Sequence, residues 1–275
     1  MTPRLVFVLG AGYTGLRVAR QARAAGAQVV CAVRSPERAD SLRAEGFEVW
    51  QGPALDVDRI AARLGPDTQV VIAFPPDGET DARLAPTLTA AGSVRYVSTT
   101  GVYGPEAKVL DPSTPVSATP SKSHARVLEA EAGYRAVGAT ILRAPGIYGP
   151  DRGLHVRVVQ GKHTLAGDGD NVLSRIHVED LAALLLARPE VRSTTYVVGD
   201  GGTDTQREVV AWICAEYGVP FPPSVPVESV HASLRVSRRI DPSKALHDLG
   251  VTLKWPSFRE GMARSATRIA SAQRL

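Results

Sequence analysis

The chain of 275 residues has little cysteine and few aromatic residues. Its two cysteines, Cys31 and Cys214, lie in apolar surroundings without metal-site or disulfide spacing. We therefore expect two buried thiols, a reducing compartment and no metal. Aromatic residues make up only 5%, which argues against the stacking platforms that bind single-stranded nucleic acid. The net charge of +4 is small and the basic residues are scattered, so no nucleic-acid partner is expected.

Long apolar segments are also missing. No run approaches the length of a membrane span, so neither a spanning helix nor a membrane partner is expected. Residues Met1–Arg4 lead directly into a strand-like segment without a secretory signal pattern, and we expect a cytoplasmic protein. The hydrophobic content of 44% suits one large α/β domain, with or without a smaller lobe.

A glycine-rich turn stands in an informative place. Residues Gly10–Gly15 read Gly-Ala-Gly-Tyr-Thr-Gly and follow the apolar run Leu5–Leu9. A helical pattern covers Thr14–Ala25, and a second strand pattern follows at Gln28–Val33. Strand, glycine turn, helix and strand in this order form the dinucleotide-binding unit.

Each residue of the turn has an expected part in holding a cofactor. Gly10 would permit the tight turn, Gly12 would let a pyrophosphate approach the backbone, and Gly15 would let the helix pack closely on the strand. Tyr13 and Thr14 open the helix, whose first N–H groups and positive dipole end would face the phosphates.

The end of the second strand predicts which dinucleotide is preferred. NAD-binding sites place an acid there to bind the ribose 2′-hydroxyl, but this chain has Val33 followed by Arg34 and Ser35. A guanidinium can bind a 2′-phosphate through two parallel hydrogen bonds, and a hydroxyl can add a third. We therefore predict NADP(H) in preference to NAD(H), although Arg34 could instead be a solvated loop cation.

Strand and helix patterns alternate through the first half, which predicts a parallel sheet covered on both faces. The strand patterns are Leu5–Leu9, Gln28–Val33, Phe47–Trp50, Gln69–Phe74, Val94–Ser98 and Ala139–Leu142. The helix patterns are Thr14–Ala25, Pro36–Glu45, Asp58–Leu64, Thr80–Ala91 and Lys122–Val137. Ligands bind such sheets at the carboxyl ends of the strands.

The second half is less regular. Asp151–Asn171 has the composition of a loop with short elements. Thr205 and Glu208 fit a capping box, and Asp241 and Pro242 fit an N-cap and first helical residue. We expect a Rossmann core over about 1–150, with 151–275 completing this core and forming a lobe.

Several strings together resemble the extended and atypical short-chain dehydrogenase/reductases, a superfamily of nucleoside-sugar epimerases, dehydratases and reductases. They occur in the family's order between residues 5 and about 190. The strings are Gly10–Gly15, Ser98–Gly104 (STTGVYG), Leu142–Pro150 (LRAPGIYGP) and Arg175–Leu181 (RIHVEDL). The resemblance implies one α/β unit, a doubly wound Rossmann-type sheet with a small C-terminal substrate lobe. Such proteins often form homodimers, so a homodimer is an expectation here.

The resemblance also implies roles for residues at the strand ends. Thr99 stands at the position of the family's catalytic Ser/Thr, which hydrogen-bonds the reacting oxygen. Pro145 and Ile147 would lie beside the nicotinamide, and Phe74 and Pro75 would border the cofactor ribose.

The family's Tyr-x-x-x-Lys pair is not intact in this chain. The corresponding stretch, Thr119–Glu129, contains no tyrosine. If Arg126 takes the lysine position, Lys122 takes the tyrosine position. A small shift in the alignment would place Ser121, Ser123 or His124 there instead.

The missing tyrosine leaves the proton donor open. Arg126 could hold a ribose hydroxyl but cannot act as a base. Lys122 could protonate an alkoxide, His124 titrates in the useful range, and Tyr103 and Tyr148 are alternative acids. The alternatives are a solvated helix N-terminus for Lys122 and His124, and packing with a bonded hydroxyl for the two tyrosines.

Four residues are candidates for substrate binding. Thr100 and Tyr148 are polar residues at strand ends. By the resemblance, Arg175 and Arg239 stand where the family's lobe often meets an anionic group, although ordinary ion pairs would also explain them.

The sequence thus favours an NADP(H)-dependent oxidoreductase or epimerase-like enzyme. Its substrate would be a small polar carbonyl, alcohol or sugar nucleotide, with Thr99 orienting the oxygen, Lys122 or Tyr103 supplying the proton and Arg126 holding the cofactor. One alternative is a non-catalytic NADP(H)-binding sensor, and another is a redox-neutral lyase or isomerase.

Overall fold

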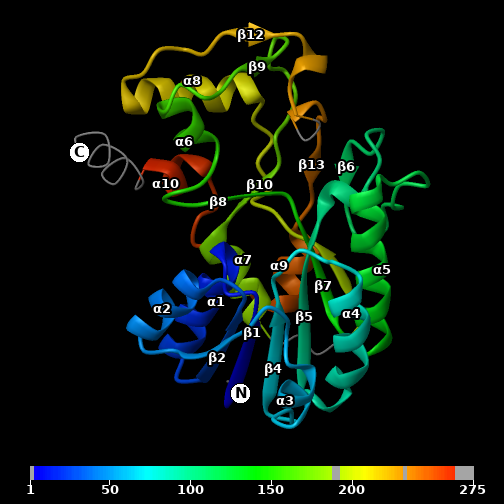
Figure 1. The fold of residues 1–275 in the computed structure, drawn as a ribbon. Helices are drawn as coiled ribbons and strands as arrows, with labels where there is room; N and C mark the ends of the chain where they lie inside the picture. Colours follow the sequence, from blue (N-terminus) through cyan, green and yellow to red (C-terminus); the bar gives the residue numbers. More distant parts are fainter. Residues whose placement is uncertain (1–2, 188–192, 232–233, 264–275) are drawn as a thin grey trace.

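The computed structural model describes residues 3–187, 193–231 and 234–263, which form a layered α/β core below a smaller lobe (Figure 1). Within these ranges the core sheet has seven strands. They are β1 (Leu5–Leu9), β2 (Gln28–Val33), β3 (Glu48–Gln51), β4 (Thr68–Ile72), β5 (Ser93–Thr99), β7 (Thr140–Ala144) and β11 (Thr195–Val197).

The sheet is parallel throughout, in the order β11-β7-β5-β4-β1-β2-β3. Strand β1 lies between β2 and β4, and Phe7 pairs in register with Val30 and Val70. Because the strand order reverses beside β1, the crevice for a ligand is expected at the carboxyl end of this strand.

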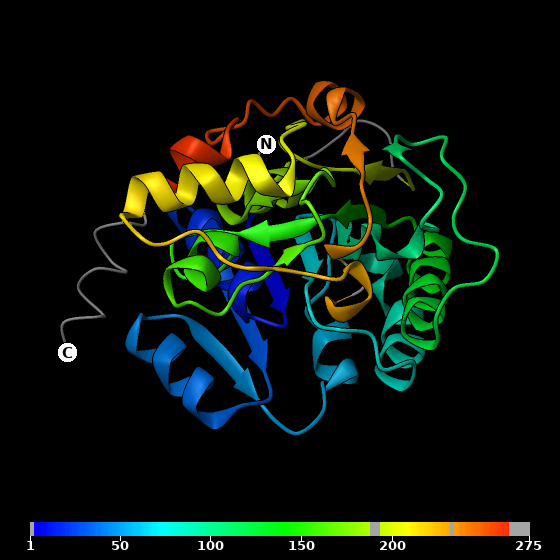
Figure 2. The same ribbon diagram turned by 90° about the horizontal axis from the view of Figure 1, so that it is seen from above.

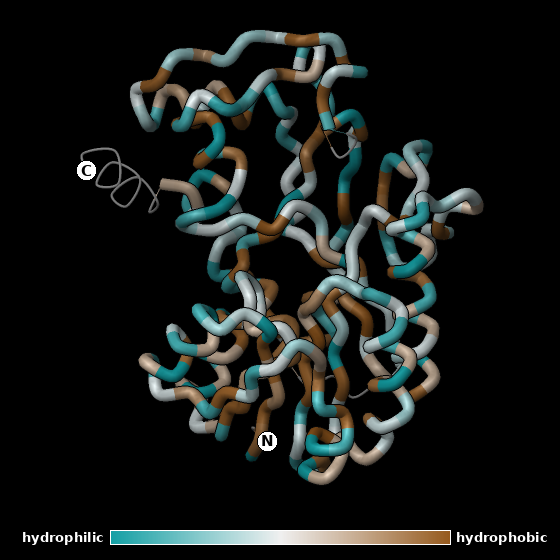
Figure 3. Tube along the Cα trace, viewed as in Figure 1, coloured by the Kyte–Doolittle hydropathy of each residue, from teal (hydrophilic) through white to brown (hydrophobic). Residues whose placement is uncertain are grey.

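Alternate residues of each strand feed two separate hydrophobic cores. In β1, Val6 and Val8 point to one face, whereas Phe7 and Leu9 point to the other. All four are completely buried because helices cover both faces, which is why the strand is a continuous apolar run. Figure 3 shows the same concentration of hydrophobic residues along the central strands.

The two faces are covered by different helices, as Figures 1 and 2 show. One face carries α1 (Tyr13–Ala24), α2 (Pro36–Ala44), α7 (Val178–Leu186) and α9 (Ser243–Leu249). The other carries α3 (Val57–Ala61), α4 (Glu79–Leu84), the 3-10 helix η1 (Ala85–Ala90) and α5 (Lys122–Ala136). This three-layer arrangement is the expected doubly wound Rossmann-type fold.

The lobe stands over the carboxyl ends of the core strands (Figure 1). Its elements are β8 (Gly146–Tyr148), α6 (Leu154–Val159), β9 (Leu165–Ala166), β10 (Arg175–His177), α8 (Gln206–Tyr217), β12 (Ser224–Val225), η3 (Val227–Ser229) and α10 (Phe258–Ala263). Its core packs Val158, Val210 and Ile213 against Phe258 and Met262. At the edge nearest α5, β6 (Val109–Leu110) pairs with β13 (Arg239–Ile240).

Segments on both sides of residue 150 build the core. Strand β11 and helices α7 and α9 come from the later part of the chain, yet they pack on the sheet. Helices α6, α8 and α10 lie in the lobe. Among the described residues, no helix combines the length and apolarity needed to cross a bilayer.

Three local expectations need correction. The helix expected over Thr80–Ala91 divides into α4 and η1, because Pro86 lacks the N–H needed to continue an α-helix. Pro242, not Asp241, occupies the N-cap of α9, although the Asp241 carboxylate still accepts the Ser243 N–H.

The third correction concerns the thiols. Cys31 is buried, and burial raises the pKa of its thiol to about 12. Cys214 is only half-buried, because it lies on α8 at the edge of the lobe core.

Candidate active site

The glycine turn has the geometry that each glycine position requires. Gly10 has a φ of +90°, and a Cβ there would lie 2.8 Å from the Phe74 backbone nitrogen. A Cβ at Gly15 would lie 2.3 Å from the Gly10 carbonyl oxygen, so α1 packs directly on the turn. A Cβ at Gly12 would meet nothing within 4 Å. The backbone is therefore open at the one position where a pyrophosphate must approach.

Helix α1 begins at Tyr13, with Gly12 as its N-cap. The first N–H groups of a helix have no carbonyl partner within it and can bind an anion. Thr14 is buried in this first turn. The guanidinium groups of Arg17 and Arg152 lie 4.2 and 5.0 Å from the centre of the Tyr13 ring, and the Arg152 contact packs a lobe loop onto the start of α1.

The end of β2 presents Arg34 as an exposed cation after the buried Val33. Ser35 is the N-cap of α2: its hydroxyl accepts the Arg38 N–H at 3.2 Å and donates to Glu37 at 2.5 Å. Because this hydroxyl already makes two bonds, Arg34 is the group more available to a 2′-phosphate.

Arg38 is a residue that sequence reasoning missed. Its guanidinium donates to the carbonyl oxygens of Ala11 and Gly12, both at 2.9 Å, and places a second cation beside the glycine turn. A basic residue in the first turn of a helix opposes the helix dipole. In the sequence, this unfavourable position near the start of the helix was the signal that Arg38 interacts with a different part of the chain.

The residues expected around the ribose and nicotinamide occupy two other strand ends. Phe74 follows β4 and is half-buried against Gly10, while Pro75 beside it is exposed. Pro145 follows β7 and is buried. Ile147 is half-buried in β8, where it pairs with Ile176.

Thr99 ends β5 and caps the next turn, η2 (Thr100–Val102), because its hydroxyl oxygen accepts the Gly101 N–H at 3.0 Å. Thr100 is buried. Its carbonyl oxygen accepts a hydrogen bond from Arg238 at 2.9 Å. The Thr99 hydroxyl can still donate its own proton to a substrate oxygen.

Helix α5 begins beside this turn, with Ser121 as its N-cap. Lys122 and Arg126 are both exposed. The imidazole of His124 lies over the turn, since its Nε2 is the atom nearest to a Cβ built on Gly101, at 2.5 Å. Lys122 and His124 are the candidate proton donors at the start of α5. Of these two, His124 is the one whose side chain is shown to pack against the turn that follows β5.

Tyr103 is 3% exposed, and its hydroxyl accepts a hydrogen bond from Arg143 at 3.0 Å. Arg143 is also paired with the buried Glu131 at 2.6 Å, and Ser98 donates to the same carboxylate. This arrangement is the packing alternative for Tyr103. The burial of Tyr103 beside Arg143 favours packing, and proton supply by Tyr103 stays a prediction from the sequence.

Tyr148 and Arg175 lie close to each other inside the lobe. Tyr148 is 2% exposed, and its ring stacks edge-on against His177 at 5.1 Å. Arg175 is 6% exposed, donates to the carbonyl oxygen of Leu173 and lies over the Phe258 ring. These contacts build the lobe, but the Tyr148 hydroxyl and Arg175 Nη1 are buried without a hydrogen-bond partner among the described residues, so direct substrate binding stays a prediction from the sequence.

Arg239 is exposed on β13, whereas its neighbour Arg238 reaches the active-site loops. Arg238 donates to the carbonyl oxygens of Thr100, Tyr103 and Gly104 at 2.7 to 2.9 Å. Arg238 thus holds the loop that follows β5, and the expected contact of Arg239 with an anionic group stays a prediction from the sequence.

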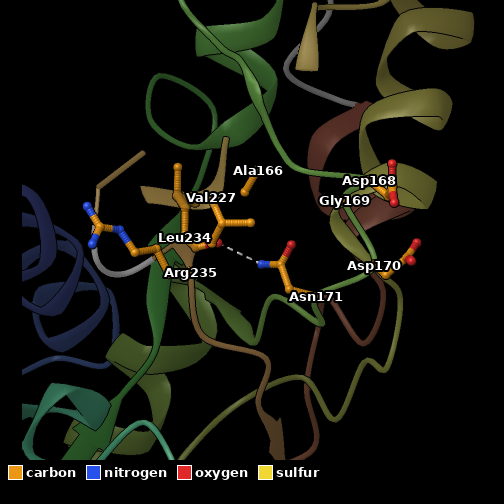
Figure 4. Close-up of a pocket in the computed structure, with 8 residues that line it drawn as sticks. All are labelled: Ala166, Asp168, Gly169, Asp170, Asn171, Val227, Leu234 and Arg235. Atoms are coloured by element: carbon orange, nitrogen blue, oxygen red, sulfur yellow. Dashed lines mark hydrogen bonds between the residues drawn. The ribbon is translucent and has the colours of Figure 1, made fainter. Parts of the chain in front are cut away.

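The lobe contains a pocket of about 210 Å³ beside β9, shown in Figure 4. Asn171 donates its amide hydrogen to the Leu234 carbonyl oxygen at 2.9 Å. Val227 and Leu234 supply an apolar wall, and Asp168 and Asp170 stand at the other side. Asn171 Oδ1 is buried and makes no hydrogen bond within the described part of the chain, so the pocket offers a free acceptor.

Comparisons agree with this architecture. The model of the NAD(P)H-binding family matches residues 10–189. The chain therefore belongs to the NAD(P)H-binding family, and its resemblance to the short-chain dehydrogenase/reductases is confirmed. No curated protein sequence matches it.

Solved structures extend the similarity over nearly the whole chain. A conserved protein of unknown function from Silicibacter pomeroyi is 27% identical with a TM-score of 0.80, covering 96% of this chain and 98% of its own. UDP-glucose 4-epimerase from Thermotoga maritima, with UDP-glucose, is 17% identical with a TM-score of 0.78, covering 98% and 99%. A human epimerase family protein with NADPH is 18% identical with a TM-score of 0.76, covering 96% and 99%. The last two establish the fold.

Proposed function

We propose that the protein is an NADP(H)-dependent oxidoreductase or epimerase-like enzyme acting on a small polar carbonyl, alcohol or sugar nucleotide. The observation that carries the cofactor preference is the end of β2, where Val33 replaces the acid and Arg34 is exposed. Arg38 adds a second cation beside Gly12. A bound NADPH would supply the hydride.

The chain's own residues would orient the substrate. Thr99 would donate a hydrogen bond to the reacting oxygen from the end of β5. Arg126 is proposed to contact the cofactor. Lys122 is the proton source that the sequence offered, although both side chains are exposed. The lobe pocket at Asn171 has room for a ring-sized part of a substrate, and the UDP-glucose bound to the Thermotoga protein is one precedent for a sugar nucleotide.

A parallel titration with NADPH and NADH, followed by nicotinamide fluorescence, tests the cofactor assignment. We expect clear preference for NADPH. Arg34→Asp should weaken NADPH binding about 10- to 100-fold, because it removes charge-assisted hydrogen bonds and adds repulsion. Arg43→Asp changes charge equally at the other end of α2 and should retain the preference. An Arg34→Asp protein that still prefers NADPH would contradict the assignment.

A non-catalytic NADP(H) sensor is the second candidate. It is favoured by the absence of tyrosine from Thr119–Glu129 and by the exposure of Lys122 and Arg126. This alternative predicts tight NADPH binding without NADPH oxidation by any member of a carbonyl panel. A small-molecule partner, a homodimer and a cytoplasmic location stay predictions from the sequence.

A further inference from the structure

We propose that His124 is the proton donor that serves in place of the missing tyrosine. The inference rests on the proposed function, because it assigns a role within the same site. It starts from the contact between the N-terminal turn of α5 and the turn that follows β5.

Gly101 shows how closely the imidazole approaches. A Cβ at this position would lie 2.5 Å from Nε2, 3.0 Å from Cε1 and 3.2 Å from Cδ2 of His124. Gly101 does not have a positive φ, so its backbone does not require glycine. The missing side chain at Gly101 instead makes room for the ring.

Thr99 and His124 therefore both contact Gly101. The Thr99 hydroxyl accepts the Gly101 N–H at 3.0 Å, while the His124 ring occupies the space where a Gly101 side chain would begin. The proposal places the substrate oxygen at the end of β5, beside both groups. The hydroxyl would orient this oxygen, and the imidazolium would protonate it.

The surroundings of the imidazole suit proton exchange. The ring is half-buried, so solvent can return a proton to it. Within the described residues its nitrogens make no recorded hydrogen bond. Its own helix carries Lys122 and Arg126, and Arg238 donates to the carbonyl oxygen of Thr100, the residue before Gly101.

NADPH held at the glycine turn would supply the hydride to the carbonyl carbon and become NADP⁺. The π electron pair would move onto oxygen, and the proton on His124 Nε2 would pass to that oxygen. The neutral imidazole then takes a proton from water. In the oxidative direction the same nitrogen accepts the proton of the alcohol.

The first test needs no substrate. The imidazole pKa of His124 is measured by NMR titration in the NADP⁺ and NADPH complexes, with the signal assigned through His124→Gln. The positive charge of the oxidised nicotinamide should lower this pKa by about half a unit or more relative to NADPH, if the ring faces it. His247, which is exposed on α9, should titrate identically in both complexes.

Two variants sharpen the test. Gly101→Ala should displace the ring, because the new methyl group overlaps Nε2, and should shrink the difference between the two complexes. With any carbonyl that the wild-type protein reduces, His124→Gln should lower kcat about 100-fold or more, with NADPH affinity nearly unchanged. His247→Gln is the matched control and should leave kcat unchanged.

The outcomes separate the two proposals. NADPH binding with identical His124 titration in both complexes would overturn the role of His124 and leave the cofactor assignment standing. Full turnover in His124→Gln would overturn it as well. Absence of binding of either dinucleotide would overturn both.

Discussion

Glu131 and Arg143 lie beneath the carboxyl end of β5, and both side chains are removed from water. Arg143 donates to both Glu131 oxygens, at 2.9 and 2.6 Å, and its remaining nitrogen holds the Tyr103 hydroxyl. Ser98 donates to the same carboxylate at 2.6 Å. A buried ion pair of this kind adds little net stability, but removing one partner leaves an uncompensated charge. The pair therefore holds the strand end that carries Thr99.

Glu131→Gln tests this network. We expect it to lower the free energy of unfolding by about 3 kcal/mol or more, because Arg143 would keep a buried charge without a counterion. Urea denaturation at neutral pH measures the change. Glu129→Gln, an exposed substitution on the same helix, should change stability by less than about 0.5 kcal/mol. Equal stability of the two variants would show that the ion pair is solvated.

Residue identity alone did not determine which side chains reach the site. Tyr103 and Tyr148 both follow strands, where a ligand would be expected, but both turn into apolar cores. Arg238 and Arg239 are neighbours, and only Arg238 is shown contacting the β5 loop. Side-chain direction depends on how the second element packs, and that information is spread over distant parts of the chain.

At the scale of elements, the turn from β1 into α1 combines two different constraints. Gly10 is required by the fold, because its φ is positive and the Phe74 backbone crowds it. Gly12 has free space around its Cα. A requirement for glycine at this position would therefore come from what binds there.

Alanine at each glycine separates these two constraints. Gly10→Ala should lower the free energy of unfolding by about 2 to 4 kcal/mol, because a Cβ there meets backbone atoms. Gly12→Ala should stay within about 1 kcal/mol of wild type but bind NADPH at least about 10-fold more weakly. Urea denaturation and fluorescence titration measure the two effects. Unchanged NADPH affinity in Gly12→Ala would place the pyrophosphate elsewhere.

Local signals predicted several elements well. The bounds of β1 and β2 match the predicted ranges, because strands covered on both faces are continuous apolar runs. Thr205 and Glu208 form the predicted capping box of α8, which ends at Tyr217 as expected. The signals failed where one residue interrupts a pattern, as Pro86 does between α4 and η1.

At the scale of the whole molecule, three buried histidines make the lobe sensitive to acid. Burial lowers the pKa of His155, His163 and His177 to about 4 each, from an ordinary value of 6.5. The unfolded chain takes up protons at these positions as the pH falls below 6.5, but the folded chain does not until about pH 4. Stability is therefore fully present above pH 6.5 and declines as the pH falls toward 4.

His155→Phe isolates one of these contributions. His155 is completely buried, and its ring should contribute a loss of about 2 kcal/mol between pH 7.5 and pH 5. The variant should lose correspondingly less stability than wild type over the same interval, measured by urea denaturation at both pH values. His247→Gln, at an exposed site, should follow the wild-type pH dependence. Parallel curves for His155→Phe and wild type would contradict the buried neutral ring.

The sequence by itself determined the fold class, the glycine turn, the family and the absence of an acid after β2. These are local features, set by the alternation of apolar residues and by short motifs with their own backbone geometry. Only the tertiary structure decided that Arg38 caps the glycine turn, that Tyr103 belongs to a buried network and that His124 lies over Gly101. Each of these contacts joins two separate elements, and their relative placement depends on the packing of the whole core rather than on any one segment.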